Sequence, residues 1–223
     1  FFFQAEDGIR HFCLSRGLGD VYKRQYGVKD VHFGGPNGDD YLWIADNNNA
    51  GYRKSAYRGE LAIPGDIKSF DTGWFLGNTL NDDPTSMQWS SDGRKLYICD
   101  HYRDKVYQYN AEDWAPDYFM NHKTPVYYGT ASITSGEPRG IAIMPNGKDV
   151  YIADSSADDI RHYVMSTAWD ITTLSYSGNG YDRIEIYGYD SHVKDLFVDS
   201  GGRQMLLVGN NDHDLVEWRM NFS

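Results

Sequence analysis

Residues 87–100 read MQWSSDGRKLYICD, and residues 141–154 read IAIMPNGKDVYIAD, which repeats the same pattern. Asp46, Asp100 and Asp154 close three copies of this pattern and lie 54 residues apart. In the two copies quoted, an apolar segment leads into Asp-Gly or Asn-Gly, which tolerate the positive φ of tight hairpin turns, and a second apolar segment follows. A repeat of this length predicts an array of similar sheet units.

Four copies of the repeat share a similar opening. Residues 28–31 read VKDV and residues 193–196 read VKDL, while the other two copies open at Pro84 and Pro138. The second strand expected in each copy is apolar on both faces, which is typical of a sheet covered on both sides. One aligned column in these strands holds small residues, as expected where neighbouring sheets pack closely: Ala45, Cys99, Ala153 and Val208.

Two further strands complete each expected unit. Third strands are predicted at residues 106–109, 160–163 and 215–218, and fourth strands at residues 125–131 and 181–187. No stretch shows convincing helical periodicity. Four short antiparallel strands recurring at this period predict an all-β fold, a β-propeller whose four-stranded blades stack around an axis.

The motif residues also resemble a known group of proteins. A proline is followed by Ser-x-Asp-Gly-x-x-x-Tyr-Ile-x-Asp at residues 90–100 and by Val-Tyr-Gln-Tyr at residues 106–109. This pattern resembles the YVTN/NHL/WD40-like superfamily of β-propeller repeats over residues 26–223. The resemblance implies the fold and leaves the function open, because propellers host binding, scaffolding and catalysis alike. It places blades at about residues 26–80, 81–135, 136–190 and 191–223, the last one incomplete.

The first 25 residues share no pattern with the rest of the chain. They resemble the translation of sequencing-adapter DNA, most clearly in RGLGDVYKRQ at residues 16–25. We interpret them as a non-native assembly scar, with a disordered N-terminal arm as the alternative. The remaining residues amount to about 3.7 units, which favours an N-terminally truncated arc of a larger ring over a complete four-bladed ring. Truncation predicts an exposed apolar blade face, prone to self-association, at Val31, Phe33, Leu42 and Ile44.

Composition excludes some classes of partner. The chain has 21 Lys and Arg against 32 Asp and Glu, a net charge of -11, so binding of nucleic acid through a basic surface is not expected. No apolar run is long enough to insert into a membrane. Cys13 lies in the segment interpreted as a scar, which leaves Cys99 alone, so no disulfide framework is expected.

Carboxylates recur where the second strands end. In a propeller, the loops that follow these strands share one rim with the loops that join the blades, so their oxygen atoms would gather on one face. Oxygen-rich loops suit hard cations, which makes Ca²⁺ the candidate cofactor. Aspartate also bonds the local backbone in turns, and this role alone explains its recurrence in a repeat. The candidate ligands are Asp46, Asp100, Asp104, Asp154 and Asp158.

Aromatic residues in or near loops are the candidate binding residues. Rigid rings can stack on sugars or anchor a protein partner. Trp114 and Trp169 occupy equivalent places in two repeats, so packing between blades is the preferred interpretation for them. A repeated position indicates architecture, whereas a position unique to one blade indicates function. The candidates are Tyr102, Trp114, Tyr118, Trp169 and Tyr181.

The sequence therefore favours a non-catalytic binding or scaffold module that recognises a protein or glycan through its rim, at a cell or virion surface. No catalytic residue is assigned. A metal-dependent hydrolase similar to propeller lactonases is the first alternative, and Asp100, Glu137 and Asp154 are its nearest candidate ligands. That family typically has an asparagine on the inner strand where this chain has Arg139, with Thr85 and Lys194 in the neighbouring copies. A purely structural repeat is the second alternative.

Overall fold

The structure is a computed structural model. It describes residues 28–34, 41–46, 55–60, 63, 74–75, 83–110, 126–134, 136–178, 183–185, 193–199, 201–209 and 215–219. The segment interpreted as an assembly scar, residues 1–25, lies outside these ranges. Within them, no helix is long and apolar enough to cross a membrane.

The described residues form four antiparallel sheets, and each sheet is called a blade from here on. The first blade has the strands β1 (Val28–Phe33), β2 (Tyr41–Asp46), β3 (Ser55–Glu60) and β4 (Trp74–Phe75). The second has β5 (Pro84–Trp89), β6 (Lys95–Asp100), β7 (Lys105–Asn110) and β8 (Val126–Ser132). The third has β9 (Pro138–Ile143), β10 (Asp149–Asp154), β11 (Asp159–Met165), β12 (Leu174–Tyr176) and β13 (Arg183–Glu185). The fourth has β14 (Asp195–Val198), β15 (Gln204–Val208) and β16 (Leu215–Arg219).

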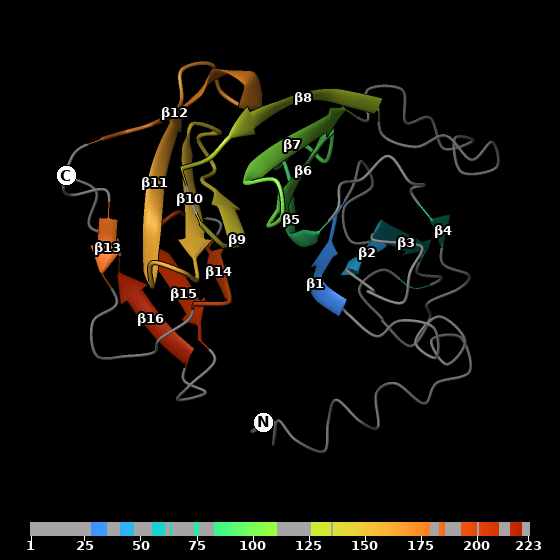
Figure 1. Cartoon of the computed structure of the whole chain (residues 1–223). Coiled ribbons are helices and arrows are strands. Elements are labelled where there is room, and N and C mark those ends of the chain that lie inside the picture. The colour runs from blue at the N-terminus through green and yellow to red at the C-terminus, as the bar shows by residue number, and fades with distance from the viewer. Residues whose placement is uncertain are drawn as a thin grey trace.

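The blades follow one another around an arc (Figure 1). The first strand of each blade, β1, β5, β9 and β14, lies on the inner side, and each of these strands contacts the next along the chain. Later strands of each blade lie progressively farther out, from β6 through β7 to β8 in the second blade. The predicted all-β fold with four-stranded antiparallel blades is confirmed.

The hairpins between the first two strands of a blade form as their turn residues predict. Gly93, Gly147 and Gly202 have φ values of 67°, 68° and 65°, a region open to glycine at low cost. Each glycine N–H donates to a carbonyl three residues earlier, at 2.8 Å in all three turns. Three copies of one turn geometry explain why the repeat is visible in the sequence.

The outer edge of the third blade differs from the prediction of one strand at residues 181–187. β12 pairs with Tyr163–Met165 and β13 pairs with Asp159–Arg161, so two short segments share the edge of β11. The cause is a 3₁₀ turn at Ile171–Thr173 (labelled η4), capped by the Asp170 side chain, which accepts from the Thr172 N–H. This turn brings the chain back to β11 sooner than the hydrophobic pattern indicates.

Apolar side chains from facing blades form the core. The predicted column of small residues points toward the next blade: Ala45 packs in the cluster with the second blade, Cys99 in the cluster with the third, and Ala153 in the cluster with the fourth. All three have no exposed surface. Val208, in the last described blade, is 45% exposed, and Phe197 on the same blade is 59% exposed.

The expected open apolar face on the first blade is only partly present. Val31 is exposed, but Leu42 and Ile44 are buried, so the prediction was wrong for these two residues. The side chain of Phe33 lies outside the described part of the structure. Exposed apolar side chains occur instead on the fourth blade, at Phe197 and Val208, because the described chain places no further sheet there.

Candidate functional site at the centre of the arc

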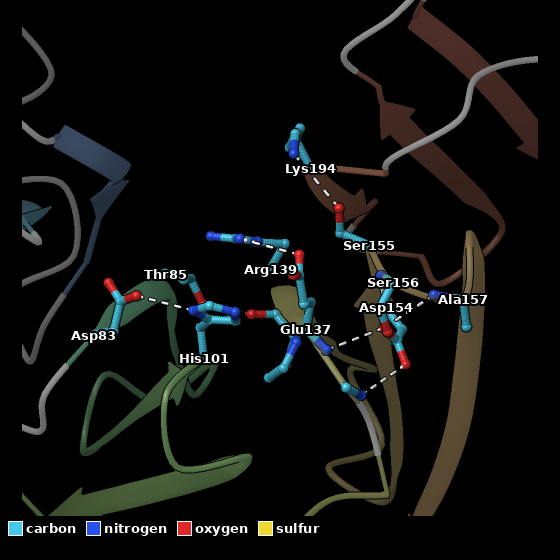
Figure 2. Close-up of polar contacts among 12 residues, drawn as sticks. Asp83, Thr85, His101, Glu137, Arg139, Asp154, Ser155, Ser156, Ala157 and Lys194 are labelled. Atoms are coloured by element: carbon cyan, nitrogen blue, oxygen red, sulfur yellow. Dashed lines mark hydrogen bonds and ion pairs between the residues drawn. The ribbon is translucent and has the colours of Figure 1, made fainter.

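A β-bulge interrupts the inner strand of the first three blades at the same place. In β1, Val28 lies opposite Asp46 and Asp30 opposite Ala45, which leaves Lys29 as the extra residue. Thr85 in β5 and Arg139 in β9 are the corresponding extra residues. A bulge redirects its side chain out of the regular alternation of the strand. Figure 2 shows the Arg139 side chain reaching from β9 toward the inner strands of the earlier blades.

The residue after each bulge makes the contact between neighbouring inner strands. The Asp30 carboxylate accepts from the Ser86 hydroxyl at 3.2 Å and from the Met87 N–H at 2.7 Å. The Ser86 hydroxyl oxygen in turn accepts from the Ile141 N–H at 3.3 Å. Two residues farther along β5, the Gln88 side chain donates to the Ile143 carbonyl and accepts from the Ile143 N–H. Directional hydrogen bonds therefore supplement the apolar contacts between blades.

The third blade has Gly140 at this position, and β14 approaches it closely. A Cβ on Gly140 would lie 2.7 Å from Asp195 Oδ1, 2.9 Å from Asp195 Cα and 2.9 Å from the Leu196 nitrogen. Real Cβ atoms do not approach backbone atoms this closely. Because Gly140 has no side chain, β14 can come this close. Asp195 of the fourth blade therefore lines the same cavity as Asp30 of the first blade and Ser86 of the second.

All four inner strands line a cavity of about 160 Å³. Its polar lining comes from β1, β5 and β14, while β9 contributes Ile141 and Ala142. The cavity is large enough for several water molecules or a small ligand. Its polar residues are Asp30, His32, Ser86, Gln88 and Asp195.

Two titratable groups of the cavity have shifted pKa values. Burial, and secondarily the negative charge of Asp30, raises the pKa of Asp195 to about 7, against the weaker opposite effect of a hydrogen bond from the Leu196 N–H. Burial lowers the pKa of His32 despite the nearby Asp30 carboxylate. At neutral pH the cavity therefore holds a carboxyl group poised to gain or lose a proton, next to a second carboxylate.

Sequence reasoning did not select Asp30, His32 or Asp195 as site residues. One signal was present, because the first and last repeats both contain Val-Lys-Asp at residues 28–30 and 193–195. Asp30 and Asp195 come together because the four inner strands surround one cavity. The sequence pattern of a single repeat does not encode the distance between two residues of different repeats.

Aspartates of the rim tie the loops between β6 and β7 and between β10 and β11 to the segments that join blades. The Asp154 Oδ1 accepts from the N–H groups of Glu137 at 3.3 Å and Ser156 at 3.0 Å, and the Oδ2 accepts from Gly136 at 3.3 Å. Figure 2 shows this carboxylate between the two segments. The equivalent Asp100 accepts from the Arg103 N–H at 3.0 Å. The rim predicted from the sequence therefore exists, and its buried carboxylates stabilise backbone turns.

The equivalent aspartates Asp154 and Asp100 differ in the contacts that their Oδ2 atoms make. Arg161 contacts Asp154 Oδ2 at 3.0 Å and Asp159 Oδ1 at 3.3 Å. Tyr107 stands in the second blade where the third has Arg161, and the buried Asp100 Oδ2 has no hydrogen-bond partner among the described residues. Burial accordingly raises the pKa of Asp100.

This difference predicts unequal effects of the same substitution. Asp154→Asn retains an Oδ1 acceptor but places an amide N–H₂ where Gly136 and Arg161 now donate, so the free energy of unfolding should fall by about 2 kcal/mol. Asp100→Asn places its amide where no donor is displaced, and should cost less than about 1 kcal/mol. Urea unfolding of the two variants measures both values, and equal losses would contradict the assignment.

The candidate calcium ligands whose side chains are described, Asp100, Asp104, Asp154 and Asp158, are not brought into one cluster. In the part of the chain that the structure describes, no group of three or more His, Cys, Asp or Glu side chains could hold a metal ion. Asp104 and Asp158 occupy equivalent loop positions with φ values of 51° and 52°, a left-handed conformation that aspartate adopts more readily than most residues. The side chain of Asp46 lies outside the described part. The described aspartates therefore recur for reasons of backbone geometry.

Comparison with solved structures identifies the architecture. No protein-family model matches the chain, and no curated protein matches it. A nidogen/laminin complex contains a similar structure, with a TM-score of 0.57 and 14% sequence identity over 86% of this chain. A putative 6-phosphogluconolactonase from Bacteroides fragilis is similar with a TM-score of 0.56 and 15% identity over 87% of this chain. A functionally unknown protein from Desulfotomaculum acetoxidans has a TM-score of 0.52 and 12% identity over 86% of this chain.

The fold is that of a β-propeller. The chain spans 60%, 51% and 55% of the lengths of these three structures, in the same order. At 12 to 15% sequence identity the likeness shows the fold alone. The function has to be argued from the residues of this propeller.

The two predicted aromatic residues that the structure describes, Tyr102 and Trp169, do not lie together. Tyr102 lies in the loop between β6 and β7 and is 71% exposed. Trp169 lies at the opposite end of the blades, where its side chain covers Gly147 and its carbonyl accepts from Lys95 at 2.9 Å and Tyr97 at 2.8 Å. The structure thus gives Trp169 a role in packing between blades. Trp114, Tyr118 and Tyr181 lie outside the described residues.

Proposed function

We propose that this propeller is a non-catalytic binding module that takes a protein partner on the rim formed by the β6–β7 loop, the β10–β11 loop and the segments between blades. The observation that carries the proposal is the position of Tyr102. Its ring is 71% exposed on this rim, and no repeat requires an aromatic residue there, because the third blade has Ser156 at the equivalent place.

The backbone that carries Tyr102 is held on both sides. The Asp100 carboxylate accepts from the Arg103 N–H, and the His101 N–H donates to the Asp83 carbonyl at 3.0 Å. The His101 ring contacts the Asp83 carboxylate at 2.9 Å (Figure 2). A tyrosine on a fixed loop offers a large contact area with few rotatable bonds, so its burial by a partner loses little conformational entropy. Tyrosines of this kind are frequent anchors in protein interfaces.

The similarity to a structure from a nidogen/laminin complex supports this function, because a propeller of this general form is there part of a complex between proteins. The similarity carries no information about which protein this chain would bind, at 14% identity. The described rim has one exposed aromatic ring, that of Tyr102, and a tyrosine is a frequent anchor in protein interfaces, which supports a protein as the partner.

The alternative, a hydrolase, draws on the likeness to a putative 6-phosphogluconolactonase and on Asp195, whose raised pKa would suit a general base. The rim carboxylates favour binding instead. Asp154 accepts hydrogen bonds from backbone groups and contacts Arg161, and Glu137 contacts Arg139 at 3.2 Å, so a metal or a water nucleophile would have to displace these contacts. Turnover of a panel of lactones by the wild type, lost in Asp195→Asn, would establish the alternative.

Selection of peptides tests the proposed binding function. A displayed library of random peptides is selected on the immobilised protein, and the affinities of the selected peptides are compared between wild type and Tyr102→Ser, which introduces the residue of the third blade. We expect most selected peptides to lose at least about tenfold in affinity, as for an interface anchor.

Val126→Ser is the matched control, because Val126 is 68% exposed on the outer strand β8, away from the rim. It should leave the affinities unchanged. If the selected peptides are insensitive to Tyr102→Ser, the rim is not the binding surface. If the protein binds to a glycan array and Tyr102→Ser abolishes this binding, the partner is a glycan and not a protein.

A further inference from the structure

The bulge positions gather positive charge at one end of the central cavity. Lys29 and Arg139 are bulge residues of β1 and β9, and Lys194 holds the corresponding place directly before β14. Thr85, the fourth member, donates its hydroxyl hydrogen to the Pro138 carbonyl at 3.0 Å. Three of four equivalent positions around the inner strands are therefore cationic in a chain whose net charge is -11.

The rim carboxylates of Asp83, Asp100 and Asp154 have contacts other than these cations. Asp100 and Asp154 have no exposed surface and accept hydrogen bonds from backbone N–H groups. The Asp83 carboxylate contacts the His101 ring. Among the described rim residues, Glu137 is the carboxylate that contacts one of the three cations, at 3.2 Å from an Arg139 terminal nitrogen, and its side chain is 41% exposed.

The cations keep hydrogen-bonding capacity that the described residues do not use. The Arg139 Nε is buried and has no hydrogen-bond acceptor within the described ranges. The Lys194 ammonium reaches the Ser155 hydroxyl only at 3.5 Å, the limit of a hydrogen bond (Figure 2). An ammonium carries three donors and a guanidinium five, so both groups can donate hydrogen bonds to a further oxygen atom. Lys29 is exposed to solvent.

We propose that Lys29, Arg139 and Lys194 form a binding site for an oxyanion, the carboxylate or phosphate group of a small acidic molecule, at the mouth of the central cavity. A guanidinium binds two oxygens of such a group side by side, and the two ammonium groups approach as point charges. Asp30 and Asp195 lie one residue deeper and repel a second negative charge, so the anionic group stays at the mouth. This site is formed by residues of the inner strands, whereas Tyr102 lies in the β6–β7 loop, and the proposal does not depend on the protein partner.

Calorimetric titration with inorganic phosphate and, separately, with succinate tests the site at constant ionic strength. Arg139→Gln and Lys194→Gln should each lose at least about tenfold in affinity, since each removes a charge-assisted hydrogen bond. Arg203→Gln is the matched control, because Arg203 is exposed in the turn between β14 and β15, and the net charge changes by the same amount.

Glu137→Gln supplies a readout that a purely structural role of Arg139 would not give. It removes the carboxylate that contacts Arg139 and should tighten anion binding by a few fold. Binding of both probes supports a general oxyanion site. Binding of phosphate alone indicates a phosphate group as the ligand, and binding of succinate alone indicates a carboxylate. If neither probe binds, or if Arg203→Gln weakens binding as much as Arg139→Gln does, the proposal is overturned.

Discussion

Gly140→Ala is expected to lower the free energy of unfolding by about 3 kcal/mol, a large share of the stability of a typical domain. The added Cβ would lie 2.9 Å from both Asp195 Cα and the Leu196 nitrogen, which are backbone positions that cannot rotate away. The inner strands β9 and β14 would have to separate. Urea unfolding followed by tryptophan fluorescence measures the loss.

Gly201→Ala is the control for this prediction. A Cβ on Gly201 would meet Asp199 Oδ2 at 3.1 Å, which is the end of a side chain, and other atoms only at 3.9 Å or more. Gly201 is exposed in the turn before β15, so the substitution should change stability by less than about 0.5 kcal/mol. Similar losses in both variants would show that close approach of β14 to Gly140 does not determine the stability of the fold.

Asp195→Asn is expected to make the protein more stable than the wild type at about pH 8, by about 4 kcal/mol. The pKa of Asp195 is raised from 3.8 to about 7 in the folded chain, so the folded state binds this proton more tightly than the unfolded state does. The stabilisation by the protonated group is complete below pH 3.8 and is lost as the pH rises through about 7. The variant has no such loss because its amide does not ionise.

The measurement is the difference in unfolding free energy between variant and wild type across this pH range. The difference should be near zero at about pH 4 and grow toward about pH 8. Asp30 and His32 are the other titratable groups of the cavity, and because the Asp30 charge acts on Asp195, the pH dependence of the difference reports the interacting Asp195–Asp30 pair. A difference that is independent of pH would show that Asp195 is not a buried, repelled carboxyl group.

Asp199→Asn should show the opposite trend and serves as the control. Hydrogen bonds from the N–H groups of Gln204, Arg203 and Gly201 lower the pKa of this exposed turn aspartate. Its stabilisation is present above its ordinary pKa and is lost as the pH falls through the lowered value. The variant should therefore be less stable than the wild type at neutral pH, with a deficit that shrinks in acid.

The sequence predicted the blades well because their determinants are local. Asp92-Gly93 and Asn146-Gly147 specify tight turns, and the apolar segments on either side specify the two inner hairpin strands. The broken outer edge of the third blade was missed because it depends on the cap that Asp170 provides to a short 3₁₀ turn, and such a cap has little effect on hydrophobic periodicity. The exposed face predicted on the first blade was wrong for Leu42 and Ile44, because their burial depends on tertiary contacts.

The site was harder to predict for the same reason. Tyr102 was selected because it is aromatic and lies in a loop, and it is exposed as expected, but Trp169 has similar features and packs between blades. Asp30 and Asp195 come from opposite ends of the chain and meet only because the inner strands curve around a common cavity. Residue type and spacing do not report such a contact, although the shared Val-Lys-Asp shows that the two positions are equivalent.

The bulge in the inner strands of the first three blades has a consequence for engineering. The bulged residue is extra to the ladder of hydrogen bonds, so its identity can change while the pairing on both sides stays in register. Nature has placed lysine, threonine and arginine at these equivalent points on one unchanged frame. A library randomised at residues 29, 85, 139 and 194 alone would therefore sample new ligand specificities at the cavity mouth without redesign of the scaffold.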